Sequence, residues 1–129
     1  MRSRQTACMR VTVCQCPGDA DLAAQWPLLV DHVRLHSSHF VLLPELPFST
    51  WLPEIDHFDA ADWEAAVAAH DRWETRFIEL APARVAGTRP VDFGNERYEE
   101  GFVWSASLGL AAVHAKTLLR DDDHCRESV

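Results

Sequence analysis

The sequence feature that most constrains the fold is a short apolar run that ends abruptly in prolines. Residues 39–43 are almost continuously apolar, which is typical of a strand buried on both faces of a sheet. Pro44, Pro47 and Pro53 follow, and because proline has a fixed φ and no backbone N–H, they predict a stiff loop over residues 45–56. A strand of this kind needs helices to cover it, so the run favours the α/β class.

Amphipathic segments on both sides of this strand predict two main helices. The first carries an apolar stripe interrupted by Pro27, and we expect its regular part to begin there, because the first helical position does not need the missing N–H. The second is expected to start near Asp59 and to run to about Leu80. The stripes consist of Leu22, Trp26, Leu29, Val30 and Val33 in the first helix and Trp63, Val67, His70, Trp73, Phe77 and Leu80 in the second.

The remaining segments are predicted to be strands. Residues 9–15 alternate and are β-branched, residues 83–89 form a short strand, and residues 97–106 and 110–118 form a hairpin. The order β-α-β-α-β-β-β predicts a mixed sheet with both main helices on one face. We expect a flexible N-terminus over residues 1–8, one domain over 9–119 and a polar tail over 120–129.

Composition excludes several classes of function. The chain has 129 residues, 12 basic and 20 acidic, and a net charge of −8, which argues against nucleic acid and anionic membranes as main partners. No apolar run has the length of a membrane span, and no signal peptide precedes the first strand. The four cysteines, Cys8, Cys14, Cys16 and Cys125, form no C-x-x-C pair, so we expect reduced thiols and a cytoplasmic protein.

Two charged residues on apolar segments are the candidate site residues. Glu45 follows the strand at 39–43, at the end where ligands gather in α/β sheets, and Lys116 lies within the apolar segment 111–119. A carboxylate there can move protons and an ammonium can stabilise an oxyanion. A solvated loop glutamate and an edge-strand lysine that opposes aggregation are the competing interpretations. His32, His36 and His39 have spacing that suits a metal, but a solvated helix face is the preferred interpretation, so no metal or cofactor is predicted.

Three segments resemble a known family. Leu42-Leu43-Pro44-Glu45 resembles the catalytic-glutamate segment of the nitrilase (carbon–nitrogen hydrolase) superfamily, residues 112–118 resemble its catalytic-lysine segment, and residues 9–15 resemble its opening strand. The resemblance implies part of an α-β-β-α sandwich. It also implies that Glu45 is the general base and Lys116 the oxyanion stabiliser. In the family, a cysteine thiolate attacks a small amide or nitrile, and water releases the resulting thioester.

The sequence departs from the family at the nucleophile. Family members place the catalytic cysteine after a further strand, whereas Cys125 lies nine positions past Lys116 in the polar segment. We therefore expect a truncated enzyme that is inactive alone. The other interpretation is a non-catalytic interaction or oligomerisation module, and a homo-oligomer is compatible with both. If the family match holds, we expect Glu45 and Lys116 to come from neighbouring strands, with charged groups within about 4–6 Å and with Phe48 or Trp51 walling the pocket.

Overall fold

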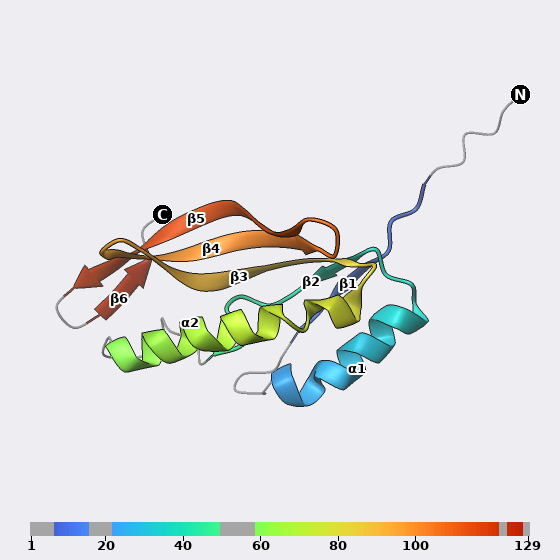
Figure 1. Cartoon of the computed structure of the whole chain (residues 1–129), viewed down its shortest axis with the longest axis horizontal. Coiled ribbons are helices and arrows are strands. Elements are labelled where there is room, and N and C mark those ends of the chain that lie inside the picture. Colours follow the sequence, from blue (N-terminus) through green and yellow to red (C-terminus); the bar gives the residue numbers. More distant parts are fainter. Residues whose placement is uncertain (1–6, 16–21, 50–58, 122–123, 128–129) are drawn as a thin grey trace, which may run out of the picture.

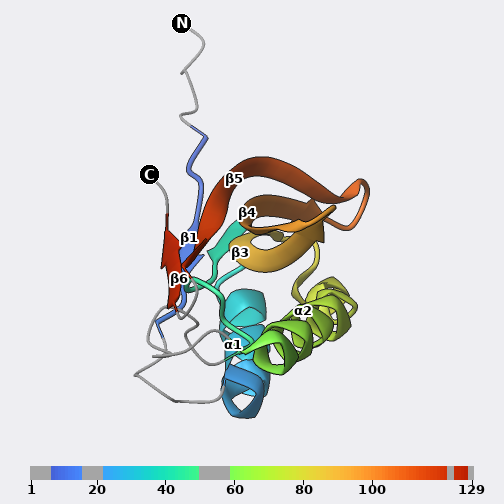
Figure 2. The same ribbon diagram turned by 90° about the vertical axis from the view of Figure 1, so that its left-hand side faces the viewer.

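The structure, a computed structural model, describes residues 7–15, 22–49, 59–121 and 124–127. Helices α1 and α2 lie on the same side of a twisted sheet (Figures 1 and 2). The predicted α/β class, with both main helices on one face, is confirmed. Most of the expected flexible N-terminus, residues 1–6, lies outside the described residues. The elements in order are β1 (Val11–Val13), α1 (Leu22–Leu35), β2 (Phe40–Leu42), α2 (Ala60–Glu74), the 3₁₀ helix η2 (Phe77–Leu80), β3 (Arg84–Phe93), β4 (Glu96–Ser105), β5 (Gly109–Asp121) and β6 (His124–Glu127).

The strands follow one another in the sheet in sequence order, from β1 to β6. The first three are parallel, because a helix crosses over between each consecutive pair, whereas β3, β4 and β5 form an antiparallel meander. The pairing of β4 with β5 shifts by one residue next to Gly101: Phe102 opposes Ala112, but Gly101 opposes His114, which leaves Val113 as the extra residue of a bulge.

The segment expected to be a polar tail, residues 120–129, contains strand residues in its described part. Arg120 and Asp121 complete β5, and His124–Glu127 form β6, which pairs antiparallel with the end of β5. Backbone N–H and C=O groups pair in the same way whatever side chains they carry. A polar composition therefore did not exclude a hairpin.

Helix α1 begins earlier than predicted. It starts at Leu22 and contains Pro27 in its interior, although an interior proline costs about 3 kcal/mol. Leu22 and Trp26 are 2% and 0% exposed, and burying a large apolar side chain contributes about 1.5–3 kcal/mol. Packing of the first turn against the core therefore offsets the cost of the proline.

Helix α2 ends earlier than predicted. Asp59 caps its N-terminus by accepting hydrogen bonds from the backbone of Ala61 and Asp62, but the helix ends at Glu74. The hydroxyl of Thr75 then donates to the carbonyl of Arg72 at 2.6 Å. The chain continues as η2, which buries Phe77 and Leu80 and leaves Ile78 exposed. The apolar stripe was predicted correctly, but its last turn is a 3₁₀ helix.

Strand β3 is longer than the predicted segment 83–89, because it runs on to Phe93 and turns into β4 at Gly94, whose φ is 61°. Pro90 lies within it without breaking the sheet. Its partner on one side is Glu99 of β4, and β2 pairs with β3 only over Arg84–Ala86. The position of the missing N–H of Pro90 therefore lies on the β2 side of β3, beyond the end of the hydrogen bonds between these two strands.

Aromatic side chains from every layer form the core. Phe48 and Trp73 stack with ring centroids 4.9 Å apart, and Trp26 lies 5.1 Å from Trp73. Phe77 lies 5.8 Å from Phe102 of β4 and so joins the helices to the sheet. The arrangement ties α1, α2, η2, the loop after β2 and β4 into one unit.

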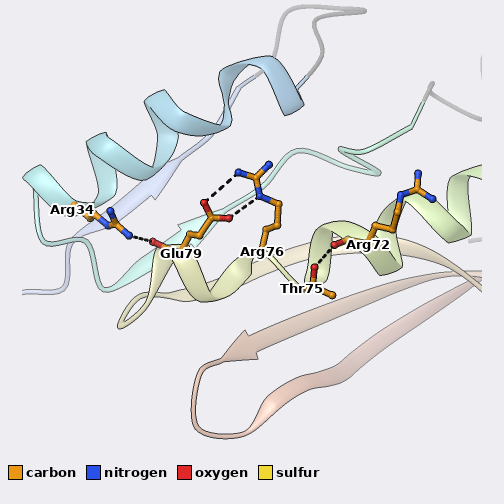
Figure 3. A network of polar contacts seen from close by, with 5 residues as sticks. All are labelled: Arg34, Arg72, Thr75, Arg76 and Glu79. Carbon is orange, nitrogen blue, oxygen red and sulfur yellow. Dashed lines mark hydrogen bonds and ion pairs between the residues drawn. The ribbon is translucent and has the colours of Figure 1, made fainter.

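Polar contacts connect α1 with the segment after α2 (Figure 3). Arg34 of α1 donates to the backbone carbonyl of Glu79 at 3.2 Å, and Arg76 pairs with the Glu79 carboxylate at 2.7 Å. The Arg76 guanidinium also lies 4.8 Å from the centre of the Trp73 ring. Arg34 therefore links α1 to η2, whereas the Arg76–Glu79 pair lies within one segment and, because both side chains are exposed, adds little stability.

The core predicts a large difference between two positions of α1. Trp26→Ala should reduce the free energy of unfolding by about 3–5 kcal/mol, because it removes a fully buried indole. Leu28→Ala on the same helix is the control, since Leu28 is 70% exposed and its loss should change stability by less than about 0.5 kcal/mol. Urea unfolding followed by far-UV circular dichroism measures both. Equal effects would contradict the assignment of the core.

Candidate active site

The loop that carries Glu45 is held at two points. The residue after Glu45, Leu46, is buried and adopts a φ of 42°, a left-handed conformation that is rare for a residue with a side chain. Its N–H donates to the hydroxyl of Thr88 on β3 at 2.9 Å. Two residues on, the N–H of Phe48 donates to Nε2 of His70 on α2 at 3.4 Å. The strained backbone persists because the sheet and the helix both fix it.

His70 is a buried, neutral histidine. Its Nδ1 lies 2.7 Å from the carbonyl of Ala66. A backbone N–H can only donate, so Nε2 accepts from Phe48 and Nδ1 carries the proton that is donated to Ala66. Burial is the main cause that lowers the His70 pKa to about 4. Protonation at Nε2 would remove the acceptor of the Phe48 bond and release one anchor of the Glu45 loop.

We predict that His70 contributes an acid-sensitive part of the stability. Between pH 6.5 and about 4 the unfolded histidine binds a proton and the folded one does not, so this stability is present above pH 6.5 and is lost as the pH falls. Across that window the wild type should lose up to about 3 kcal/mol relative to His70→Gln. Urea unfolding at several pH values measures the difference. The exposed His36→Gln is the control, and parallel curves for wild type and His70→Gln would refute the prediction.

Lys116 meets Glu45 at the open end of the β2 loop. Its Nζ donates to Oε1 of Glu45 at 3.3 Å, across 71 positions of sequence, and both side chains are partly exposed. The expected proximity is therefore present, and the catalytic roles of the two residues stay a prediction. The expectation that they come from neighbouring strands is wrong, because β3 and β4 lie between β2 and β5. The loop anchored at Thr88 of β3 and the long lysine side chain together span that gap.

A third charged residue, Glu99, belongs to the same site and was not predicted. It lies directly opposite Lys116 on the neighbouring strand β4, its side chain is 1% exposed, and its Oε2 is 3.5 Å from Nζ. Simple counting from the hairpin turn, where Ser105 opposes Gly109, would place Ala115 opposite Glu99. The bulge at Val113 shifts the register by one residue, and such a shift moves side chains to the other face of the sheet. Sequence alone gave no signal for it.

The carboxyl of Glu99 is strongly perturbed. Burial, the largest cause, and the adjacent carboxyl of Glu45 together raise its pKa to about 7. The ammonium of Lys116 and the hydroxyl of Thr88 act in the opposite direction but do not cancel these effects. The site therefore holds a half-exposed carboxylate, a buried carboxyl that titrates near neutral pH and one lysine between them.

Removal of the lysine should show how much a buried, ionised Glu99 destabilises the folded protein. At pH 8, where Glu99 is ionised, Lys116→Met should lower the free energy of unfolding by about 1–3 kcal/mol. At pH 5.5 the loss should be smaller, because a protonated Glu99 needs no counter-charge. The double variant Glu99→Gln/Lys116→Met should recover most of the stability lost at pH 8. Urea unfolding at the two pH values measures this, and a loss independent of pH would contradict it.

Other predicted residues lie elsewhere or outside the described part. Phe48 packs in the aromatic core, and Trp51, its proposed companion as a pocket wall, lies outside the described residues. His32 and His36 are exposed, with rings 4.4 Å apart. The described residues contain no group of three potential metal ligands and no helix long and apolar enough to cross a membrane. Cys8 is exposed and Cys14 is partly buried. Cys16 is outside the described residues, and the backbone of Cys125 pairs with that of Arg120.

Comparison with known proteins gives structural relatives and no sequence relatives. No family model matches the chain, and no curated protein matches it. The structure of a carbon–nitrogen hydrolase from Helicobacter pylori G27 superposes with a TM-score of 0.63 at 11% identity, covering 87% of this chain and 40% of that one. An amidase from Nesterenkonia sp. superposes with a TM-score of 0.54 at 17% identity, covering 87% of this chain and 43% of the amidase. The chain therefore has the fold of part of a carbon–nitrogen hydrolase, over less than half the length of these enzymes.

Proposed function

We propose that this chain supplies the general base and the oxyanion-stabilising cation of an acyl-transfer site that acts on the carbon–nitrogen bond of a small amide or nitrile. The observation that carries the proposal is the contact of Glu45 with Lys116 at 3.3 Å. The fold shared with a carbon–nitrogen hydrolase and an amidase supports it. So does the way the Glu45 loop is fixed by Thr88 and His70.

The geometry assigns complementary tasks to the two residues. Glu45 is 39% exposed at its side chain, so a water molecule or a nucleophile can reach its carboxylate and transfer a proton to it. The ammonium of Lys116, 33% exposed, can donate a hydrogen bond to the oxygen of a carbonyl under attack. Because the two groups touch, a carbonyl bound beside them can face both the base and the cation.

The proposed reaction divides into two halves. In the first, Glu45 takes the proton of a thiol, the thiolate adds to the amide carbon, the carbon–nitrogen bond breaks, and the amine leaves with the proton that Glu45 returns, giving a thioester. In the second, Glu45 takes a proton from water, the hydroxide adds to the thioester carbon, and the carbon–sulfur bond breaks to release the acid and the thiol. Only the first half needs a thiol on the protein. The second half therefore tests Glu45 and Lys116 alone.

We predict that the chain hydrolyses a small thioester such as an acyl N-acetylcysteamine. Glu45→Gln should lower the rate above buffer by about 10²-fold or more, the usual contribution of a general base. Glu100→Gln is the control, because Glu100 is a glutamate of β4 that pairs with Arg89 at 2.9 Å instead of with Lys116. Simple amides should not be turned over by this chain. Release of the free thiol, followed with a thiol-reactive dye, measures the reaction.

Two results would overturn the proposal. A thioester rate equal to that of buffer would show that the contact is not a catalytic arrangement, and the chain would then be an interaction module with a hydrolase fold. A rate that is unchanged in Glu45→Gln would place the activity elsewhere. Far-UV circular dichroism of each variant shows that a lost rate does not come from unfolding.

A further inference from the structure

Glu99 is a buried acid with no task in the reaction described above. It lies in the middle of β4, between Pro90 of β3 and Lys116 of β5 in the pairing register. The donors near its oxygens are the Lys116 ammonium, 3.5 Å from Oε2, and the hydroxyl of Thr88, and among the described residues neither oxygen accepts a hydrogen bond of ordinary length and angle. Ionised carboxylates are rarely buried without donors, because desolvation of the charge is costly. A protonated carboxyl at this position removes most of that cost.

The charges around Glu99 lead to the same conclusion. The ammonium of Lys116 contacts Oε2 of Glu99 at 3.5 Å and Oε1 of Glu45 at 3.3 Å. One cation therefore faces two carboxyls, and two acids that share a site do not ionise independently. The hydroxyl of Thr88 on β3 also acts on Glu99, and Arg97, two positions along β4, has its Nε 3.9 Å from Asp92.

We propose that Glu99 is a positioning residue of the Glu45–Lys116 site, which fixes the lysine from the buried side and stores one proton beside Glu45 at neutral pH. The contact with Lys116 and the stored proton do not depend on the proposed function, but their part in catalysis rests on it. In that setting, a proton that Glu45 takes from water can be held by the pair Glu45/Glu99, and the pair returns it to the leaving thiolate. One O–H bond of water breaks and one S–H bond forms, so no external acid is needed.

The chain offers a direct probe of this arrangement. Lys116 is the only lysine among the 129 residues, so lysine labelled with ¹³C at the ε carbon gives one side-chain signal in an NMR spectrum. The chemical shift of that carbon responds to the charge of carboxyls that contact the ammonium. A pH titration of the intact chain therefore reports on Glu45 and Glu99 without an activity assay.

The expected result is a step in the Lys116 signal with a midpoint near pH 7, because burial raises the pKa of Glu99 to about 7. Glu99→Gln should abolish this step, and Glu100→Gln should keep it. Glu45→Gln should move the midpoint to lower pH, because a neighbouring negative charge is removed. A wild-type signal without a step between pH 5.5 and 8.5, or a step that persists in Glu99→Gln, would overturn the proposal.

Two further measurements keep the test decisive. If Glu99→Gln does not fold, the wild-type titration and the direction of the shift in Glu45→Gln still support or refute the stored proton. The pH–rate profile of thioester hydrolysis gives the catalytic arm: its midpoint should move by more than about one pH unit in Glu99→Gln, a change that a purely structural role would not produce. A neutral step in the NMR titration without any thioester hydrolysis would support the stored proton and refute the proposed function.

Discussion

The stacking of Phe48 on Trp73 is the contact on which the rest of the structure depends. Phe48 belongs to the loop after β2, and Trp73 belongs to the last turn of α2. Their contact, extended by Trp26 and Phe77, attaches the helices to the sheet and at the same time fixes the loop that carries Glu45. The same contacts therefore pack the core and place the site. Disruption of the aromatic cluster would displace the carboxylate as well as destabilise the fold.

The charged groups of the site are arranged from the buried side to the exposed side. The side chain of Glu99 is buried, that of Lys116 is partly exposed and contacts Glu99, and that of Glu45 contacts the lysine from the solvent side. This order gives the two carboxyls different properties although they share one cation. The buried acid retains a proton more readily, and the exposed one is accessible to water and substrate. His70 adds a second buried titratable group, which stays neutral and supports the loop.

Much of the fold could be predicted from local patterns. Apolar periodicity placed both helices and the strands around the predicted hairpin, because these features depend on which residues must be buried. The errors occurred where packing overrode a local preference. Pro27 lies inside α1 because Leu22 and Trp26 are buried on its first turns, and α2 ends at Glu74 because Thr75 and η2 give Phe77 and Leu80 a better fit to the core. The hairpin of β5 and β6 could not be predicted from the polar sequence there, since backbone pairing does not depend on apolar side chains.

The sequence by itself determined the α/β class and singled out Glu45 and Lys116, because a charged residue that ends or interrupts an apolar segment is visible without coordinates. Only the tertiary structure decided that they meet. The loop after β2 crosses to β3 through the Leu46–Thr88 hydrogen bond, and the bulge at Val113 turns Lys116 onto the face of Glu99. Side-chain direction in a strand alternates with every residue, so one extra residue changes which groups can touch. That register is set by the pairing of whole strands, and no local pattern in the sequence contains it.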